Sequence, residues 1–95
     1  MQVEKLIALA AEKIGSEYRV AQAVGATQQR LNDWKHHRAP CMPEDRLLLA
    51  DVAGVDPIPE IREAMLERWE GKPKGERLRA AFAKHLQNVR NFYLS

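Results

Sequence analysis

Cysteine is almost absent from this chain of 95 residues, which has only Cys41. A single cysteine cannot form an internal disulfide bond. The N-terminal segment also lacks the uninterrupted apolar run of a signal peptide, because charged residues such as Glu4 and Lys5 interrupt it. Both absences fit the reducing cytoplasm, and we expect a cytoplasmic protein without a membrane partner.

Motifs for metal binding and catalysis are missing as well. The possible metal ligands are His36, His37, His85 and Cys41. They contain no Cys-x-x-Cys or His-x-x-x-His pair of the kind that sets zinc geometry, and no glycine-rich phosphate loop occurs elsewhere. Four glutamates spaced by three or four residues indicate an exposed helical ridge without a cleft: Glu60, Glu63, Glu67 and Glu70. We therefore expect no enzyme, no cofactor and no small-molecule substrate.

Strand signals are lacking too, because no segment combines β-branched alternation with a hairpin turn. Apolar residues instead recur at steps of three and four, which predicts an all-α protein. The composition, 45% hydrophobic and 29% charged, is that of an ordinary globular domain. The expected helices cover about residues 3–14, 17–24, 27–36, 43–53, 57–70 and 74–93, and the fifth of them begins at either Pro57 or Pro59.

The same periodicity predicts which side chains face inward. The candidates are Val3, Leu6, Ile7, Ala10 and Ile14 in the first helix, Tyr18, Ala21 and Val24 in the second, Leu31 and Trp34 in the third, and Leu47, Leu48, Ala50 and Val52 in the fourth. The fifth helix offers Ile58, Ile61, Met65, Leu66 and Trp69. One contiguous core is expected.

Residues 17–36, EYRVAQAVGATQQRLNDWKH, have the pattern of a helix-turn-helix. This motif needs a small residue where the two helices cross, a residue that tolerates positive φ in the turn, and apolar inner faces. Ala21 is the small residue and Gly25 occupies the turn. The apolar contacts come from Val20, Val24, Leu31 and Trp34.

With its flanks, this pattern resembles the lambda-repressor-like (Cro/repressor, XRE-type) family of phage regulators, over about residues 3–57. The resemblance implies a helix-turn-helix bundle of four to five helices, which we assign to residues 1–71. Beyond the resemblance, apolar periodicity and charge predict a basic amphipathic helix in residues 72–95. The resemblance further implies a transcriptional regulator that binds an inverted-repeat operator in double-stranded DNA as a homodimer.

The resemblance places the N-terminal end of the 27–36 helix in the major groove. Glutamine pairs bidentately with adenine through N6 and N7, so Gln28 and Gln29 are the leading candidates for base reading. Asn32 lies one turn further along the same face and is a second reader of adenine. Asp33 is a candidate acceptor from cytosine N4, although nearby phosphates repel a carboxylate.

Residues at the helix ends and in the following loop are candidates for contacts with the DNA backbone. They are Ser16, Tyr18, Arg19, Thr27, Arg30, Lys35, His36 and Arg38. Arg30 has two interpretations, a phosphate contact or a solvated surface residue, and each of the others is a candidate whose contact stays open. If several of these residues bind, affinity should fall steeply with salt, because each neutralised phosphate releases counterions.

The C-terminal helix has an apolar stripe that a five-helix core does not need. Its members are Leu78, Phe82, Leu86, Val89 and Phe92, and we expect them to form most of a two-fold interface. Charge is distributed unevenly along the chain, because the charged residues of segment 47–71 are mostly acidic and those of segment 72–95 are mostly basic. Either the acidic face of residues 47–71 and the basic face of residues 72–95 are solvent-exposed and attract each other, or the basic C-terminal segment contacts nucleic acid.

Two other functions remain open from the sequence. One is a helical protein-interaction module, antitoxin-like or a phage accessory protein, with weak or no DNA binding; the acidic fifth helix and the apolar sixth favour it. The other is an architectural, excisionase-like protein that bends DNA with weak base preference. Selection of duplexes with an inverted repeat would distinguish the operator-binding protein from both.

Overall fold

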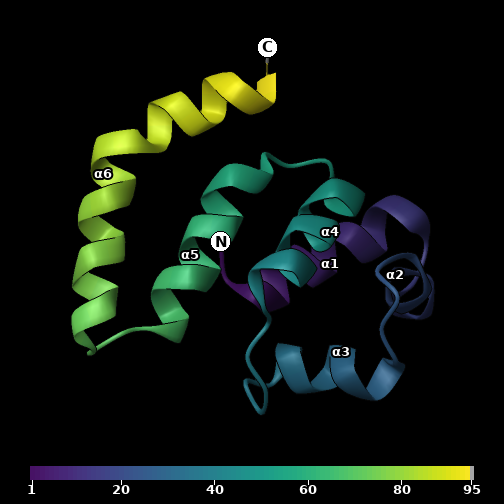
Figure 1. Ribbon diagram of the computed structural model, residues 1–95. Coiled ribbons are helices and arrows are strands. Elements are labelled where there is room, and N and C mark those ends of the chain that lie inside the picture. Colours follow the sequence, from purple (N-terminus) through teal and green to yellow (C-terminus); the bar gives the residue numbers. More distant parts are fainter. Residues whose placement is uncertain (95) are drawn as a thin grey trace.

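The computed structural model describes the backbone of residues 1–94 and the side chains of residues 1–85. It is all-helical, and no strand occurs in residues 1–94 (Figure 1). The six helices are α1 (Val3–Ile14), α2 (Glu17–Ala23), α3 (Gln28–Lys35), α4 (Pro43–Ala53), α5 (Pro57–Arg68) and α6 (Pro73–Leu94). The predicted all-α class is confirmed, and each helix lies close to its expected range.

The link between α2 and α3 is short and well defined. The hydroxyl groups of Ser16 and Thr27 cap the two helices by accepting hydrogen bonds from backbone N–H groups three residues later, at 3.2 and 3.0 Å. After α2 the chain turns at Gly25, which has a φ of 70°. The N–H of Ala26 then donates to the carbonyl oxygen of Ala21 at 2.9 Å, which closes the end of α2.

The core is formed by α1, α2, α3 and α4 around one cluster of apolar side chains. Its fully buried members are Leu6, Ile7, Ala10, Val20, Leu31, Trp34, Leu49 and Ala50. Leu31 is 0% exposed and Trp34 is 1% exposed, so the inner face of α3 is the predicted one. Burial of an aromatic ring and an isobutyl group fixes the rotation of α3 about its own axis.

The expected inward face was wrong at three positions. Tyr18 is 63% exposed, and its hydroxyl oxygen accepts a hydrogen bond from Gln22 on the outside of α2. Leu47 and Leu48 are also exposed, because α4 instead turns a stripe inward that begins at Arg46. This stripe consists of Arg46, Leu49, Ala50 and Ala53, at helical steps of three and four.

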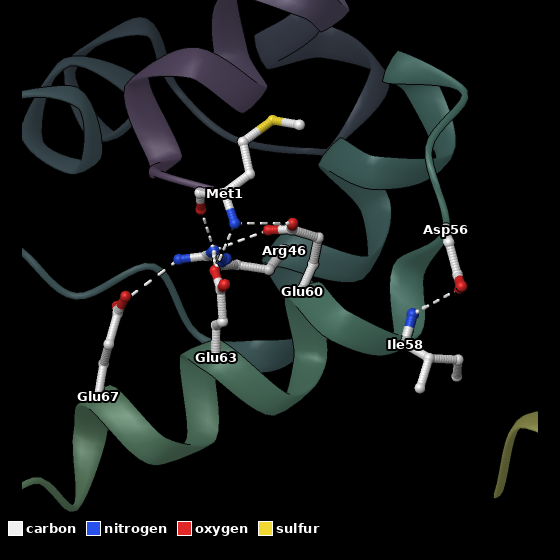
Figure 2. Close-up of polar contacts among 7 residues, drawn as sticks. All are labelled: Met1, Arg46, Asp56, Ile58, Glu60, Glu63 and Glu67. Carbon is white, nitrogen blue, oxygen red and sulfur yellow. Dashed lines mark hydrogen bonds and ion pairs between the residues drawn. The ribbon is translucent and has the colours of Figure 1, made fainter. Parts of the chain in front are cut away.

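An ion-pair network around Arg46 explains that rotation (Figure 2). The guanidinium of Arg46 contacts Glu60, Glu63 and Glu67 of α5, with N–O distances of 2.7, 2.9 and 3.6 Å. The amino group of Met1 adds ion pairs to Glu60 and Glu63 at 3.2 and 2.6 Å. The predicted exposed ridge of glutamates was wrong at Glu60, which is 4% exposed, and in part at Glu63, which is half-buried, whereas Glu67 and Glu70 are exposed as predicted.

Helix α6 lies along the outside of α5 and, within the described part of the chain, packs against no other helix (Figure 1). Two members of its predicted dimerisation stripe, Leu78 and Phe82, are half-buried. Phe82 borders a shallow surface hollow together with Arg62 and Leu66 of α5. The other three, Leu86, Val89 and Phe92, lie outside the residues whose side chains the structure describes.

Candidate nucleic-acid interface

The first turn of α3 presents a polar face to solvent. Thr27, Gln28, Gln29 and Arg30 are all exposed, whereas Leu31 and Trp34 hold the opposite face against the core. Asn32 is half-buried further along the helix. The side chains of Gln28 and Gln29 therefore project from a helix whose position is fixed by packing.

Two of the predicted base readers interact with each other. Gln29 Nε2 donates to Asp33 Oδ1 at 3.0 Å, and Arg38 Nε donates to the same oxygen at 2.9 Å. The Arg38 guanidinium holds the pKa of the Asp33 carboxyl below its usual value, and the Gln29 amide adds to this, while partial desolvation acts in the opposite direction. Because a carboxylate only accepts hydrogen bonds, the amide nitrogen of Gln29 must face Asp33, and its carbonyl oxygen is directed elsewhere.

A second contact joins the start of α2 to the end of α3. Lys35 Nζ lies 2.9 and 3.1 Å from the two carboxylate oxygens of Glu17. Both side chains are about one-third exposed, which makes this a surface ion pair of modest stabilising effect. The positive charge of Lys35, a predicted backbone contact, is thus already paired within the protein.

The remaining predicted backbone contacts lie around the same two helices. Arg19 and His36 are exposed, whereas Ser16 is half-buried and its hydroxyl oxygen is engaged in the α2 cap. Arg19 Nη1 donates to the carbonyl oxygen of Ile14, at the end of α1, at 3.3 Å. The predicted backbone-contact residues therefore lie together around α2, α3 and the loop after α3. Several of their charged groups already interact with other groups of the protein.

The end of α3 adds a feature that the sequence did not reveal. His37 has a φ of 59°, in the left-handed region that glycine adopts most easily. The N–H of His37 donates to Trp34 and that of Arg38 to Asp33, at 3.2 and 2.8 Å, so the helix ends as glycine-terminated helices do. This turn brings Arg38 back alongside α3, where it reaches Asp33.

Cys41 lies in the loop between α3 and α4 and is half-buried. Burial, together with the nearby carboxylate of Asp45, raises the pKa of its thiol to about 12. The thiol therefore stays protonated at neutral pH and is a poor nucleophile.

Comparison of the chain with protein-family models, curated proteins and solved structures found no match. Among the residues that the structure describes, no helix has both the length and the apolar character needed to cross a membrane. In the same residues, no three His, Cys, Asp or Glu side chains gather into a group suited to a metal ion. The feature of the described residues that best supports a function is the exposed polar face of α3 with the charged residues around it.

Proposed function

We propose that this chain is a sequence-specific transcriptional regulator that binds double-stranded DNA through a helix-turn-helix made of α2 and α3. One observation carries the proposal: α3 is anchored by Leu31 and Trp34, and its capped first turn presents Gln28, Gln29 and Arg30 to solvent. An α-helix fits the major groove of B-DNA, and amide side chains at its N-terminal end match the edge of adenine.

Gln28 and Gln29 are the main base-reading residues in this proposal. The Gln29 amide is oriented by Asp33, which leaves its carbonyl oxygen and one N–H to meet adenine N6 and N7. Gln28 has no hydrogen-bond partner among the described residues, so its amide is available in full. Asn32 extends the same face, and Asp33 acts chiefly by holding Gln29.

We assign contacts with the DNA backbone to the exposed cationic and hydroxyl side chains near α3. Arg30 lies between the base-reading residues of α3 and His36 lies at the end of this helix, while Arg19 and Tyr18 extend from α2. The cap formed by Thr27 places the first backbone N–H groups of α3 where they can contact a phosphate. Lys35 contributes only in competition with Glu17.

We also propose that the protein binds an inverted repeat as a homodimer in the cytoplasm, as phage or prophage regulators of this kind do. A single recognition helix covers few base pairs, so two of them about 34–36 Å apart add specificity. The long α6 packs against α5 alone within the described residues, which leaves Leu78–Leu94 as the proposed interface.

The test of base reading starts with selection of duplexes from a random pool, followed by footprinting. Gln28→Ala or Gln29→Ala should cost about 1–3 kcal/mol at the selected site and leave nonspecific binding nearly unchanged, because each removes an edge contact and no charge. Gln2→Ala, at the exposed start of α1, is the matched control. Equal losses on all duplexes would refute base reading.

The test of dimerisation uses the full chain. Leu86→Glu with Val89→Glu should shift the sedimentation of the protein toward that of a monomer and weaken binding to a full operator far more than to a half-site. Lys84→Glu, at an exposed position of the same helix, controls for the added negative charge. A double variant that stays dimeric would place the interface elsewhere.

A second candidate function is a protein-interaction module. Leu47 and Leu48 favour it, because they are 37% and 41% exposed and lie side by side in sequence on α4. Exposed leucines of this kind suit a protein partner. The same selection experiment distinguishes the two functions, since an interaction module would enrich no sequence from the random duplexes.

A further inference from the structure

Three cations surround one tryptophan where α5 meets α6. Lys74 Nζ lies 4.5 Å from the centre of the Trp69 ring, Lys72 Nζ 5.4 Å and Arg68 Cζ 5.5 Å. The three charged side chains are exposed, and Trp69 is half-buried. We call these four residues the Trp69 corner.

The corner is held in place by the backbone. The N–H of Lys72 donates to the carbonyl oxygen of Trp69 at 3.1 Å, and the N–H of Gly75 donates to Lys72 at 2.9 Å. Gly75 is buried, and a Cβ atom there would overlap the carbonyl oxygen of Trp69. The close approach of α6 to Trp69 therefore requires glycine, and it fixes Lys72 and Lys74 beside the ring.

The charge of the corner is not neutralised within the described part of the chain. None of its three cations forms an ion pair there, and the Glu67 carboxylate, on the residue directly before Arg68, contacts Arg46 instead. The exposed carboxylates of Glu70 and Glu76 offset part of the charge, and three cations against two carboxylates leave the corner positive. The ring attracts all three cations, but they repel one another, and a polyanion relieves that repulsion.

The corner lies on the same edge of the molecule as α3. In Figure 1 the turn between α5 and α6 and the whole of α3 form the lower edge, with the loop after α3 between them. The buried face of α3 packs toward the helices above it, so its polar face is turned to this edge. The end of α3 also lies close to the end of α5, because Trp34 and His37 line one surface pocket together with Glu67 and Glu70. A duplex held against α3 therefore comes near the corner where it passes this end of the helix.

We infer that the Trp69 corner binds the phosphate backbone of the duplex whose bases α3 reads. The inference rests on the proposed function and adds to it a contact surface from a different part of the chain. Lys72, Lys74 and Arg68 supply charge that is independent of base sequence, so the corner raises affinity and salt dependence without changing sequence preference.

Fluorescence anisotropy with a labelled duplex at several salt concentrations tests the inference. Lys72→Ala with Lys74→Ala should reduce the slope of log affinity against log salt by about 1.8, so that between 50 and 200 mM salt the wild type loses about tenfold more affinity than the variant. Lys5→Ala with Lys13→Ala removes the same charge from exposed positions of α1 and should keep the wild-type slope.

Iodide quenching provides a second measurement. The chain has two tryptophans, and Trp34 is 1% exposed, so the iodide anion reaches Trp69 alone. Duplex binding should protect Trp69 from iodide in the wild type. Quenching that is the same with and without duplex would overturn the inference.

The outcomes separate the two proposals. If Lys72→Ala with Lys74→Ala keeps the wild-type slope while Gln28→Ala still weakens sequence preference, the corner inference is wrong and the proposed function stands. If the slope falls but no sequence is preferred, the corner binds DNA and the operator-binding function is wrong. If the wild type binds no duplex, both are wrong.

Discussion

Arg46 and Glu60 form an ion pair inside the protein, with Arg46 Nη2 2.7 Å from Glu60 Oε2 and exposed fractions of 1% and 4%. The same nitrogen donates to the carbonyl oxygen of Met1 at 2.6 Å (Figure 2). This single guanidinium therefore connects the start of the chain, α4 and α5. Charges removed from water in this way stabilise a fold only while each keeps its partners.

Replacing Arg46 alone should destabilise the fold strongly. Arg46→Ala leaves the Glu60 carboxylate buried without its main partner, and we expect the free energy of unfolding to fall by about 3–5 kcal/mol. Urea denaturation monitored by circular dichroism measures the change. Arg77→Ala, at an exposed position of α6, should alter stability by no more than about 0.5 kcal/mol.

A double variant separates loss of the ion pair from loss of packing. Arg46→Met with Glu60→Met fills the same space without charge and should recover most of the stability lost in Arg46→Ala. An Arg46→Ala protein that unfolds at the wild-type urea concentration would show that the pair is not buried in solution.

Stability should also depend on pH through the Met1 amino group. Its hydrogen bond to Glu63 raises its pKa above the ordinary value of 8.0, and Glu60 adds to this, while desolvation acts in the opposite direction. Because the folded pKa is the higher one, the stabilisation is complete below about pH 8 and is lost as the pH rises through the folded pKa. Thermal melts between pH 7 and pH 10 should show that the melting temperature falls as the pH rises. Acetylation of the Met1 amino group should abolish the part of this fall that arises from that group.

Local signals explain how much of the fold was predictable. Helix boundaries are set by nearby residues, so the turn at Gly25 was predicted from the sequence, and Ser16 and Thr27 are residue types that favour the cap positions they occupy. The rotation of α4 was not predictable, because it depends on carboxylates that lie 14 to 21 positions away from Arg46 in the sequence. With leucines at three successive positions, periodicity alone could not show that Leu49 is buried and Leu47 and Leu48 are exposed.

The candidate site, like the fold, was predictable where local sequence determines it and not where distant residues do. The buried pair Leu31 and Trp34 fixed the exposed face of α3 from the sequence, and the four-residue spacing of Gln29 and Asp33 was itself a readable signal. The pairing of Lys35 with Glu17 spans 18 positions and two helices, so no local pattern indicated it. Binding of DNA by this face stays a prediction.

Release of Lys35 from Glu17 should strengthen DNA binding. Glu17→Gln removes a carboxylate that lies 2.9 Å from Lys35 Nζ and frees the ammonium group for a phosphate. We expect higher affinity for every duplex and a salt slope steeper by about 0.9, as for one additional phosphate contact. Titration of a selected and an unrelated duplex at several salt concentrations measures both effects.

A matched variant controls for net charge. Glu12→Gln changes the charge by the same amount at an exposed position of α1 and should leave the salt slope as it is. If the two variants behave alike, the effect of Glu17 arises from overall charge, and Lys35 lies outside the interface.

Asp33 should act on base reading by positioning Gln29. Asp33→Ala removes the acceptor that orients the Gln29 amide and frees Arg38, which lies 2.9 Å from the same oxygen. Affinity for unrelated duplexes should rise as a negative charge is lost, while discrimination at the base pair read by Gln29 should fall by about tenfold. In a Gln29→Ala background the same substitution should cost no further discrimination, because the side chain that Asp33 orients is already gone. Competition titrations with single-base variants of the selected site measure all four proteins. Losses that add in the double variant would mean that Asp33 reads a base itself, as a cytosine acceptor, and does not act through Gln29.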